Sequence, residues 1–65
     1  MKFKEVKKIL IENGWIHVRT NGSHYQFKKD GVNFLATVPF HSGKSISIGV
    51  IKNLEKGTNL SILNR

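Results

Sequence analysis

The 65-residue sequence predicts an α+β fold with the element order α-β-β-β-α. Apolar residues recur with helical spacing near both ends of the chain, and they alternate with polar residues in the middle. Two Asn/Asp-Gly pairs divide that middle part into three segments. This order implies a three-stranded antiparallel sheet with both helices on one face. The other face is then open to solvent or to a partner. We expect residues 1–65 to form a single domain.

Helices are expected over residues 2–13 and 48–56, where apolar side chains follow a helical stripe. Gly14 and Gly57 follow these segments, and glycine is the residue that most often ends a helix. Ser47 directly precedes the second segment and is a suitable N-cap.

Strands are expected over residues 15–19, 24–28 and 32–38. Asn21-Gly22 is predicted to form the first hairpin turn as a type I′ turn, in which both central residues have positive φ. Asp30-Gly31 supplies the second turn.

Side chains alternate along a strand, so their parity assigns each to a face. The open face is expected to carry His17, Arg19, His24, Gln26 and Lys28. The expected core is Phe3, Val6, Leu10, Ile16, Val18, Tyr25, Phe27, Phe34, Ala36, Val38, Ile48, Ile51 and Leu54. Trp15 either covers the end of this core or stacks on a base. Residues 58–65 either cover an edge of the core or fray.

The strongest compositional signal is charge. Eleven Lys and Arg against four Asp and Glu give a formal net charge of +7 and a pI near 10.2. Such a charge density indicates a polyanionic partner, bound through phosphate contacts and counterion release. An acidic protein partner, or a basic surface that only keeps the protein in solution, is the alternative.

Several other classes of protein do not fit the composition. Without cysteine the chain has no disulfide or thiolate metal site, which fits a reducing compartment. The three histidines and four acids show no metal-ligand spacing, and the apolar runs are too short to span a bilayer. The N-terminus lacks the apolar segment of a signal peptide. We expect a cytoplasmic protein with no metal, no small-molecule cofactor and no membrane partner.

His24 is the candidate for chemistry, because it follows a tight turn at the start of a strand. A histidine with an unperturbed pKa of about 6.5 exchanges a proton near neutrality, which suits RNA cleavage by the 2′-hydroxyl. His24 can act there as base or acid, while Lys28, Lys44 and backbone N–H groups stabilise the charge on phosphorus. On position alone, an ordinary surface histidine is the commoner case.

The loop His41-Ser42-Gly43-Lys44 precedes the second helix. A hydroxyl, a flexible backbone and a cation beside a helix N-terminus suit anion binding. The loop lacks the longer spacing of a P-loop, so nucleotide hydrolysis is not indicated. A plain connecting loop is the alternative.

Four groups of residues stand in a specific order through nearly the whole chain. They are Gly14-Trp15 followed by Arg19; Gly22-Ser23-His24 with Phe27; Thr37-Val38-Pro39 with His41-Ser42-Gly43-Lys44; and Gly49 with Ile51, Leu54 and Gly57. In this order and spacing the chain resembles the HicA family of type II toxin–antitoxin systems. These are small ribonuclease toxins with a double-stranded-RNA-binding-domain-like fold. The tail after Gly57 is short beside many relatives.

The resemblance implies an mRNA interferase, an endoribonuclease whose catalytic histidine lies in the Gly-Ser-His motif and maps onto His24. It also implies two partners, mRNA and a HicB-type antitoxin that neutralises the toxin. The expected RNA-binding residues are Arg19, Ser23, Lys28, His41 and Lys44. One histidine does not easily move both protons of the reaction, so water, a lysine or another histidine shares the work.

Two other functions stay open at this point. One is a double-stranded-RNA-binding module without chemistry, which reads the shape of about 16 base pairs. Lys44 before the second helix offers such a contact, although that helix lacks a dense lysine cluster. The other is a basic adaptor for an acidic protein, which explains the charge but not His24.

Overall fold

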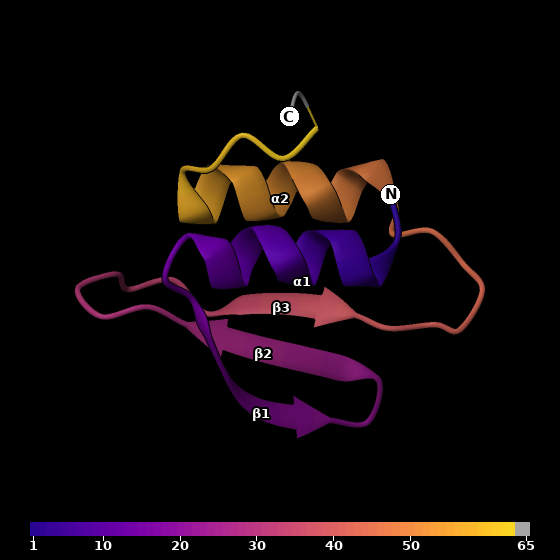
Figure 1. Ribbon diagram of the computed structural model, residues 1–65, viewed down its shortest axis with the longest axis horizontal. Coiled ribbons are helices and arrows are strands. Elements are labelled where there is room, and N and C mark those ends of the chain that lie inside the picture. The colour runs from indigo at the N-terminus through magenta and orange to yellow at the C-terminus, as the bar shows by residue number, and fades with distance from the viewer. Residues whose placement is uncertain (64–65) are drawn as a thin grey trace.

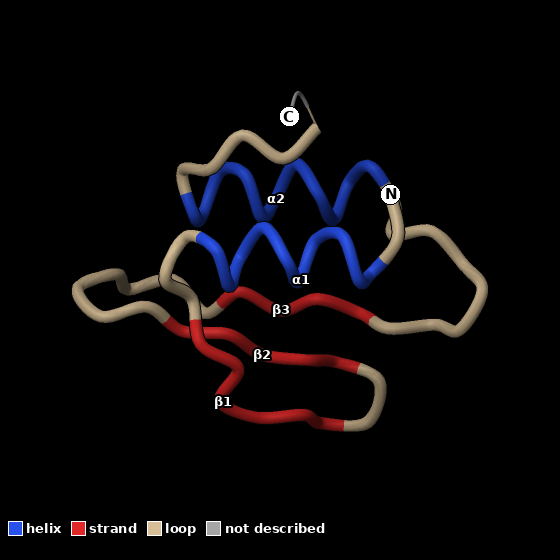
Figure 2. The backbone as a smooth tube through the Cα atoms, in the orientation of Figure 1, coloured by secondary structure: helices blue, strands red, loops and turns tan. Residues whose placement is uncertain are grey.

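The computed structural model describes residues 1–63 and shows two layers, a pair of helices and a three-stranded sheet (Figures 1 and 2). The elements are α1 (Phe3–Glu12), β1 (Ile16–Asn21), β2 (His24–Lys28), β3 (Ala36–Pro39) and α2 (Ile48–Thr58). The sheet is antiparallel in the order β1-β2-β3, and both helices cover one of its faces. The predicted fold class is therefore confirmed. Neither helix is long and apolar enough to cross a membrane.

A Schellman motif ends α1 and leads the chain into the sheet. The N–H of Trp15 donates to the Leu10 carbonyl over 3.0 Å, and the N–H of Gly14 donates to the Ile11 carbonyl over 3.1 Å. Gly14 has the positive φ, 89°, that this motif needs, as predicted. The motif carries Trp15 into the core, where its side chain is only 2% exposed. Trp15 therefore covers the end of the core.

The α2 helix begins as predicted but ends later. Ser47 is the N-cap, and its hydroxyl accepts the N–H of Val50 over 3.3 Å. The helix continues through Gly57, and Asn59 takes the left-handed conformation that closes it, with φ 62°. The prediction that Gly57 ends the helix is thus wrong. The ring of Phe34 lies where a Cβ of residue 57 would be, so close packing requires the glycine.

The same ring explains why the third strand is shorter than predicted. The sequence indicated a strand over 32–38, whereas β3 covers Ala36–Pro39. Phe34 lies against α2 and makes an edge-on contact with Trp15, with ring centroids 6.4 Å apart. This anchor holds the segment before β3 away from β2. The Asp30-Gly31 turn is nevertheless present, closed by a hydrogen bond from the residue after Gly31 to the residue before Asp30.

The first hairpin turn lies one residue further along the chain than predicted. Asn21 pairs with His24 in the ladder, so Gly22 and Ser23 are the two central residues. Only Gly22 has positive φ, 63°, which is the pattern of a type II′ turn. The predicted type I′ turn at Asn21-Gly22 is therefore wrong.

A β-bulge in β1 changes which side chains face the core. The ladder shifts between His17 and Arg19, leaving Val18 as the extra residue. An extra residue reverses the alternation on one side of it. His17 consequently shares the face of Phe27, while Ile16 and Val18 are 64% and 51% exposed. The predictions of His17 on the open face and of Ile16 and Val18 in the core are wrong.

Most of the remaining expected core is confirmed as buried or partly buried. The buried apolar residues are Val6, Ile9, Leu10, Trp15, Phe27, Ala36, Val38, Ile46, Ile51, Leu54 and Ile62. Ile48 is the further error, because it lies in the first turn of α2 on the outer side and is exposed. Ile46 occupies the core instead, and its N–H donates to the Met1 carbonyl over 2.8 Å.

The segment after α2 packs back onto the core. Glu55 Oε2 accepts the N–H groups of Ile62 and Leu63 over 2.6 and 2.9 Å, and the Ile62 side chain is fully buried. These two hydrogen bonds hold the pKa of the Glu55 carboxyl below its usual value. Of the two alternatives for this tail, the structure confirms that it covers the core, as far as Leu63. Residues 64–65 lie outside the described part.

Two glycines in α2 predict opposite responses to the same substitution. Gly57→Ala forces a methyl group against the Phe34 ring and should lower the free energy of unfolding by about 1–3 kcal/mol. Gly49→Ala meets no atom within 4 Å and should raise it by up to about 1 kcal/mol through helix propensity. Urea denaturation of both variants measures the difference. Equal effects would contradict the Phe34 packing.

Glu55 makes the stability of the tail depend on pH. Its pKa is lowered on folding, so the stabilisation is complete well above the unfolded pKa and is lost as the pH falls through the folded pKa. Glu55→Gln should therefore be less stable than the parent at neutral pH, and the gap should close in acid. Urea denaturation between about pH 7 and about pH 3 tests this. A gap that widened in acid would contradict the role of the carboxylate.

Candidate active site

His24 is the first residue of the central strand. It pairs with Asn21 in β1 and with Pro39 in β3, so strands hold its backbone on both sides. Just before it, the carbonyl of Ser23 accepts the N–H of Phe40 over 2.7 Å. The side chain itself is exposed. The sequence therefore places an accessible imidazole on a firmly held backbone.

An aromatic cluster supports this strand end from the helix side. The ring of Tyr25 lies 4.8 Å from Phe3 and 6.1 Å from Phe40, measured between centroids, and Phe3 and Phe40 are 5.0 Å apart. These rings join the start of α1, the start of β2 and the residue after β3. Because Tyr25 follows His24 on the opposite face, the cluster fixes the strand without covering the imidazole.

The two histidines of the hairpin have different surroundings. Among residues 1–63 no partner hydrogen-bonds the His24 ring, so both of its nitrogens are available to a ligand. His17 Nε2 lies 2.8 Å from the Thr20 hydroxyl, and its ring lies 5.3 Å from Tyr25 and 5.4 Å from Phe27. His17 thus faces away from His24 and is not its partner in proton transfer.

The loop that joins β3 to α2 lies at the same end of the molecule as the Gly22-Ser23 turn (Figure 1). A tight turn closes it, with the N–H of Lys44 donating to the His41 carbonyl over 3.0 Å and Gly43 at φ 76°. The N-terminus holds this loop in place. Lys2 Nζ donates to the Gly43 carbonyl over 3.0 Å, and the Lys2 backbone bridges to Ser45.

A hollow of about 220 Å³ lies between this loop and the start of α2. Its lining residues are Pro39, His41, Lys44, Ser45, Ile46 and Ser47. Cationic and hydroxyl side chains meet there at the positive end of the α2 dipole, where backbone N–H groups lack helical acceptors. The lining of this hollow is consistent with the anion binding that the sequence predicts for His41 and Lys44.

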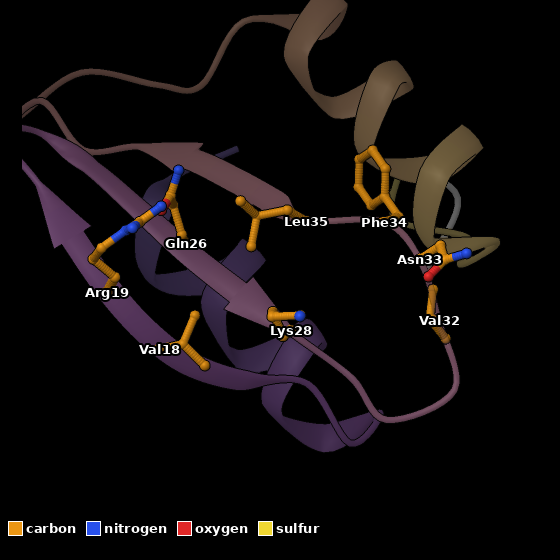
Figure 3. A pocket seen from close by; sticks show the side chains of 8 residues that line it. All are labelled: Val18, Arg19, Gln26, Lys28, Val32, Asn33, Phe34 and Leu35. Atoms are coloured by element: carbon orange, nitrogen blue, oxygen red, sulfur yellow. The ribbon is translucent and has the colours of Figure 1, made fainter.

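The other expected RNA-binding residues spread along the open face. Arg19 Nε donates to Gln26 Oε1 over 2.7 Å. Arg19 and Gln26 pair across the two strands, and on the open face they are the next pair after Asn21 and His24. Lys28 ends β2, about 14 Å along the strand from His24. Arg19, Gln26 and Lys28 border an open hollow of about 410 Å³ (Figure 3). The structure thus groups Ser23 with His24, places Arg19 nearby and separates Lys28 from them.

The strands and the loop around His24 carry only positive formal charges, although Glu5 lies next to Lys2, whose N–H donates to Glu5 Oε1 over 2.9 Å. No acidic residue lies in β1, β2, β3 or residues 40–47, so every formal charge on these segments is positive. In the described part of the chain, no three His, Asp or Glu side chains gather as a metal ion would require. The arrangement is suited to binding an anionic ligand next to an exposed imidazole.

Comparison with known families shows to which family the chain belongs. A family model for the HicA toxin of bacterial toxin–antitoxin systems matches residues 3–60. The chain belongs to the HicA toxin family. No curated protein matches it significantly. The match covers both helices and all three strands, and a toxin of this kind implies an antitoxin partner.

Two residues of this HicA-family site were not predicted from the sequence. Lys2 adds a cation to the loop from 41 positions away, and no local pattern indicates that contact. Asn21 places an amide beside His24, whereas the predicted turn assigned it to the corner. A correct prediction of the strand register would have placed Asn21 beside His24. The contact of Lys2 with the loop can be seen only in the folded structure.

The turn before His24 depends on the backbone of Gly22. A Cβ there meets no atom within 4 Å, so Gly22→Ala should lower stability through its positive φ alone, by about 1–3 kcal/mol. Ser23→Ala, at the other central position, should change it by less than about 0.5 kcal/mol. Urea denaturation distinguishes them. A neutral Gly22→Ala would contradict the type II′ turn.

Proposed function

We propose that this chain is the toxin of a type II toxin–antitoxin pair and a metal-independent endoribonuclease that cleaves mRNA. His24 is the catalytic histidine, and a HicB-type antitoxin neutralises the protein. The observation that carries the proposal is the exposed His24 ring on a rigid strand end, to which no group among residues 1–63 hydrogen-bonds and around which the strands and the loop carry only positive formal charges. The family match supports the toxin role. Because mRNA is the proposed substrate, we expect the protein to act in the cytoplasm.

RNA supplies its own nucleophile in this reaction. A base removes the proton of a 2′-hydroxyl, and the 2′-oxygen attacks the adjacent phosphorus. The bond to the 5′-oxygen breaks, and an acid protonates that oxygen as it leaves. The products are a 2′,3′-cyclic phosphate and a 5′-hydroxyl. A histidine is suited to either proton transfer, because it gains and loses a proton near neutrality.

The other proposed residues bind and orient the RNA. Ser23 directly precedes His24 in the turn and Arg19 lies one pair away on the open face, while His41 and Lys44 contact phosphate from the neighbouring loop. Cations and backbone N–H groups stabilise the additional negative charge that develops on the phosphoryl oxygens. Lys28 binds a further phosphate of the RNA backbone, farther along the open face. Because His17 faces the helix layer, water or a loop side chain serves as the second proton carrier.

A matched pair of histidine variants tests the catalytic assignment. His24→Gln should reduce cleavage of a ribo-oligonucleotide in EDTA by at least about 100-fold, because it removes the proton carrier. His17→Gln should retain activity close to that of the parent. Gel analysis of the products and circular dichroism of each variant provide the readouts.

Three outcomes would count against parts of the proposal. Equal cleavage by His24→Gln and the parent would exclude His24 as the catalyst. Cleavage of an oligonucleotide with 2′-deoxyribose at the cut site would exclude attack by the 2′-oxygen. Retardation of duplex RNA by both proteins, with cleavage by neither, would favour a non-catalytic double-stranded-RNA-binding module.

A further inference from the structure

The open face of the sheet carries an apolar patch at the end remote from His24. Ile16 and Val18 of β1 and Leu35 before β3 are 64%, 51% and 37% exposed. They come from both sides of β2 and border two adjoining hollows that share Val18 and Lys28. Val18, Lys28 and Leu35 surround one of them in Figure 3. We call Ile16, Val18 and Leu35 the sheet patch.

The bulge in β1 creates this patch. Without the extra residue, strict alternation would place Ile16 and Val18 on the face that the helices cover. Burial of apolar surface stabilises a protein by about 25 cal/mol per Å², so their exposure forgoes stabilisation that a 65-residue chain needs. Single exposed apolar residues are ordinary, but a group around a hollow on an uncovered sheet is typical of an interaction site.

The charges around the patch favour an acidic occupant. Arg19, Lys28 and Lys29 border the two hollows, and Asp30 is the single acidic residue among their lining residues. A second copy of the chain would bring another net charge of +7 against this rim. The surface therefore selects an anionic partner over itself.

The side chains of the patch favour a protein over RNA. Recognition of unpaired bases depends on stacking against aromatic rings or arginine planes. The patch is aliphatic, and the nearest aromatic lining residue, Phe34, lies against α2. Arg19 at its rim is held by the hydrogen bond from its Nε to Gln26 Oε1. Aliphatic side chains instead complement the apolar side chains of a protein interface.

We propose that the sheet patch is the anchor site for the antitoxin, an acidic protein that inserts apolar side chains against Ile16, Val18 and Leu35. The proposal rests on the proposed toxin function and adds the surface that the partner recognises. The acidic groups of the partner pair with Arg19, Lys28 and Lys29. The anchor is distinct from the catalytic histidine.

The size of a stable interface explains how such an anchor blocks catalysis. A standard interface buries about 800 Å² on each partner, a region roughly 28 Å across. His24 lies only about 14 Å along β2 from Lys28. A partner seated on the patch therefore reaches His24 and excludes RNA. Arg19 and Lys28 then serve both RNA and the partner, whereas the apolar side chains of the sheet patch serve the partner alone.

This separation can be tested with the double variant Ile16→Thr/Val18→Thr. Threonine keeps the β-branched shape that strands favour but removes apolar surface. Ile11→Thr is the control, because Ile11 is 47% exposed but lies on α1. The probe is the purified cognate antitoxin. Calorimetry measures its binding, and the ribo-oligonucleotide assay measures cleavage with and without it.

We expect the double variant to bind the probe at least tenfold more weakly and to resist inhibition. Its cleavage without the probe should stay within twofold of the parent, and Ile11→Thr should match the parent throughout. Parent-like binding by a folded double variant would overturn the proposal, as would loss of its own cleavage, which would assign the patch to RNA. Self-association of the parent that the double variant abolishes would assign it to a second copy and also overturn it.

Calorimetry separates failure of this proposal from failure of the proposed function. If the parent does not cleave RNA, the enzymatic function fails, but the binding difference between the parent and the double variant is still measurable. If the parent cleaves and both proteins bind the probe equally, only the anchor site fails.

Discussion

The register between β1 and β2 is the constraint on which the site depends. The type II′ turn at Gly22-Ser23 sets Asn21 opposite His24, which fixes the imidazole on the open face at the first position of the central strand. The bulge at Val18 then rotates the other half of β1 by one position. A register shift of one residue would turn His24 toward the helices, so both faces depend on this single hairpin.

Contacts between distant segments compensate for the small size of the domain at the active-site end. Lys2 and Phe3, at the start of the chain, hold the loop after β3 through a side-chain hydrogen bond and an aromatic cluster. Glu55 holds the C-terminal segment over the other end of the core. The Lys2 hydrogen bond joins residues 41 positions apart, whereas the Glu55 hydrogen bonds span only 7 and 8 positions. The strand that carries His24 is therefore held in place without a deep cleft.

The sequence predicts the parts of this structure that local chemistry determines. The glycine that ends α1, the N-cap of α2, the bounds of β2 and the face of His24 follow from side-chain types at fixed spacing. The turn was misplaced because Gly22 supplies positive φ equally well at either central position. The bulge has no residue signature, so the faces of Ile16 and His17 were reversed. The role of Gly57 depends on a ring 23 positions earlier in the chain, which no local pattern shows.

The two ends of the open face have different binding requirements. RNA and an acidic antitoxin both complement a basic surface, so charge alone does not distinguish them, and added salt screens both interactions. The proposed apolar anchor does distinguish them, because a protein partner can cover Ile16 and Val18 with apolar side chains of its own. In the proposed arrangement, the anchor is displaced along β2 from His24, so the end of the sheet at His24 stays open to RNA while the other end selects the inhibitor. Under this proposal, the bulge exchanges some folding stability for partner discrimination.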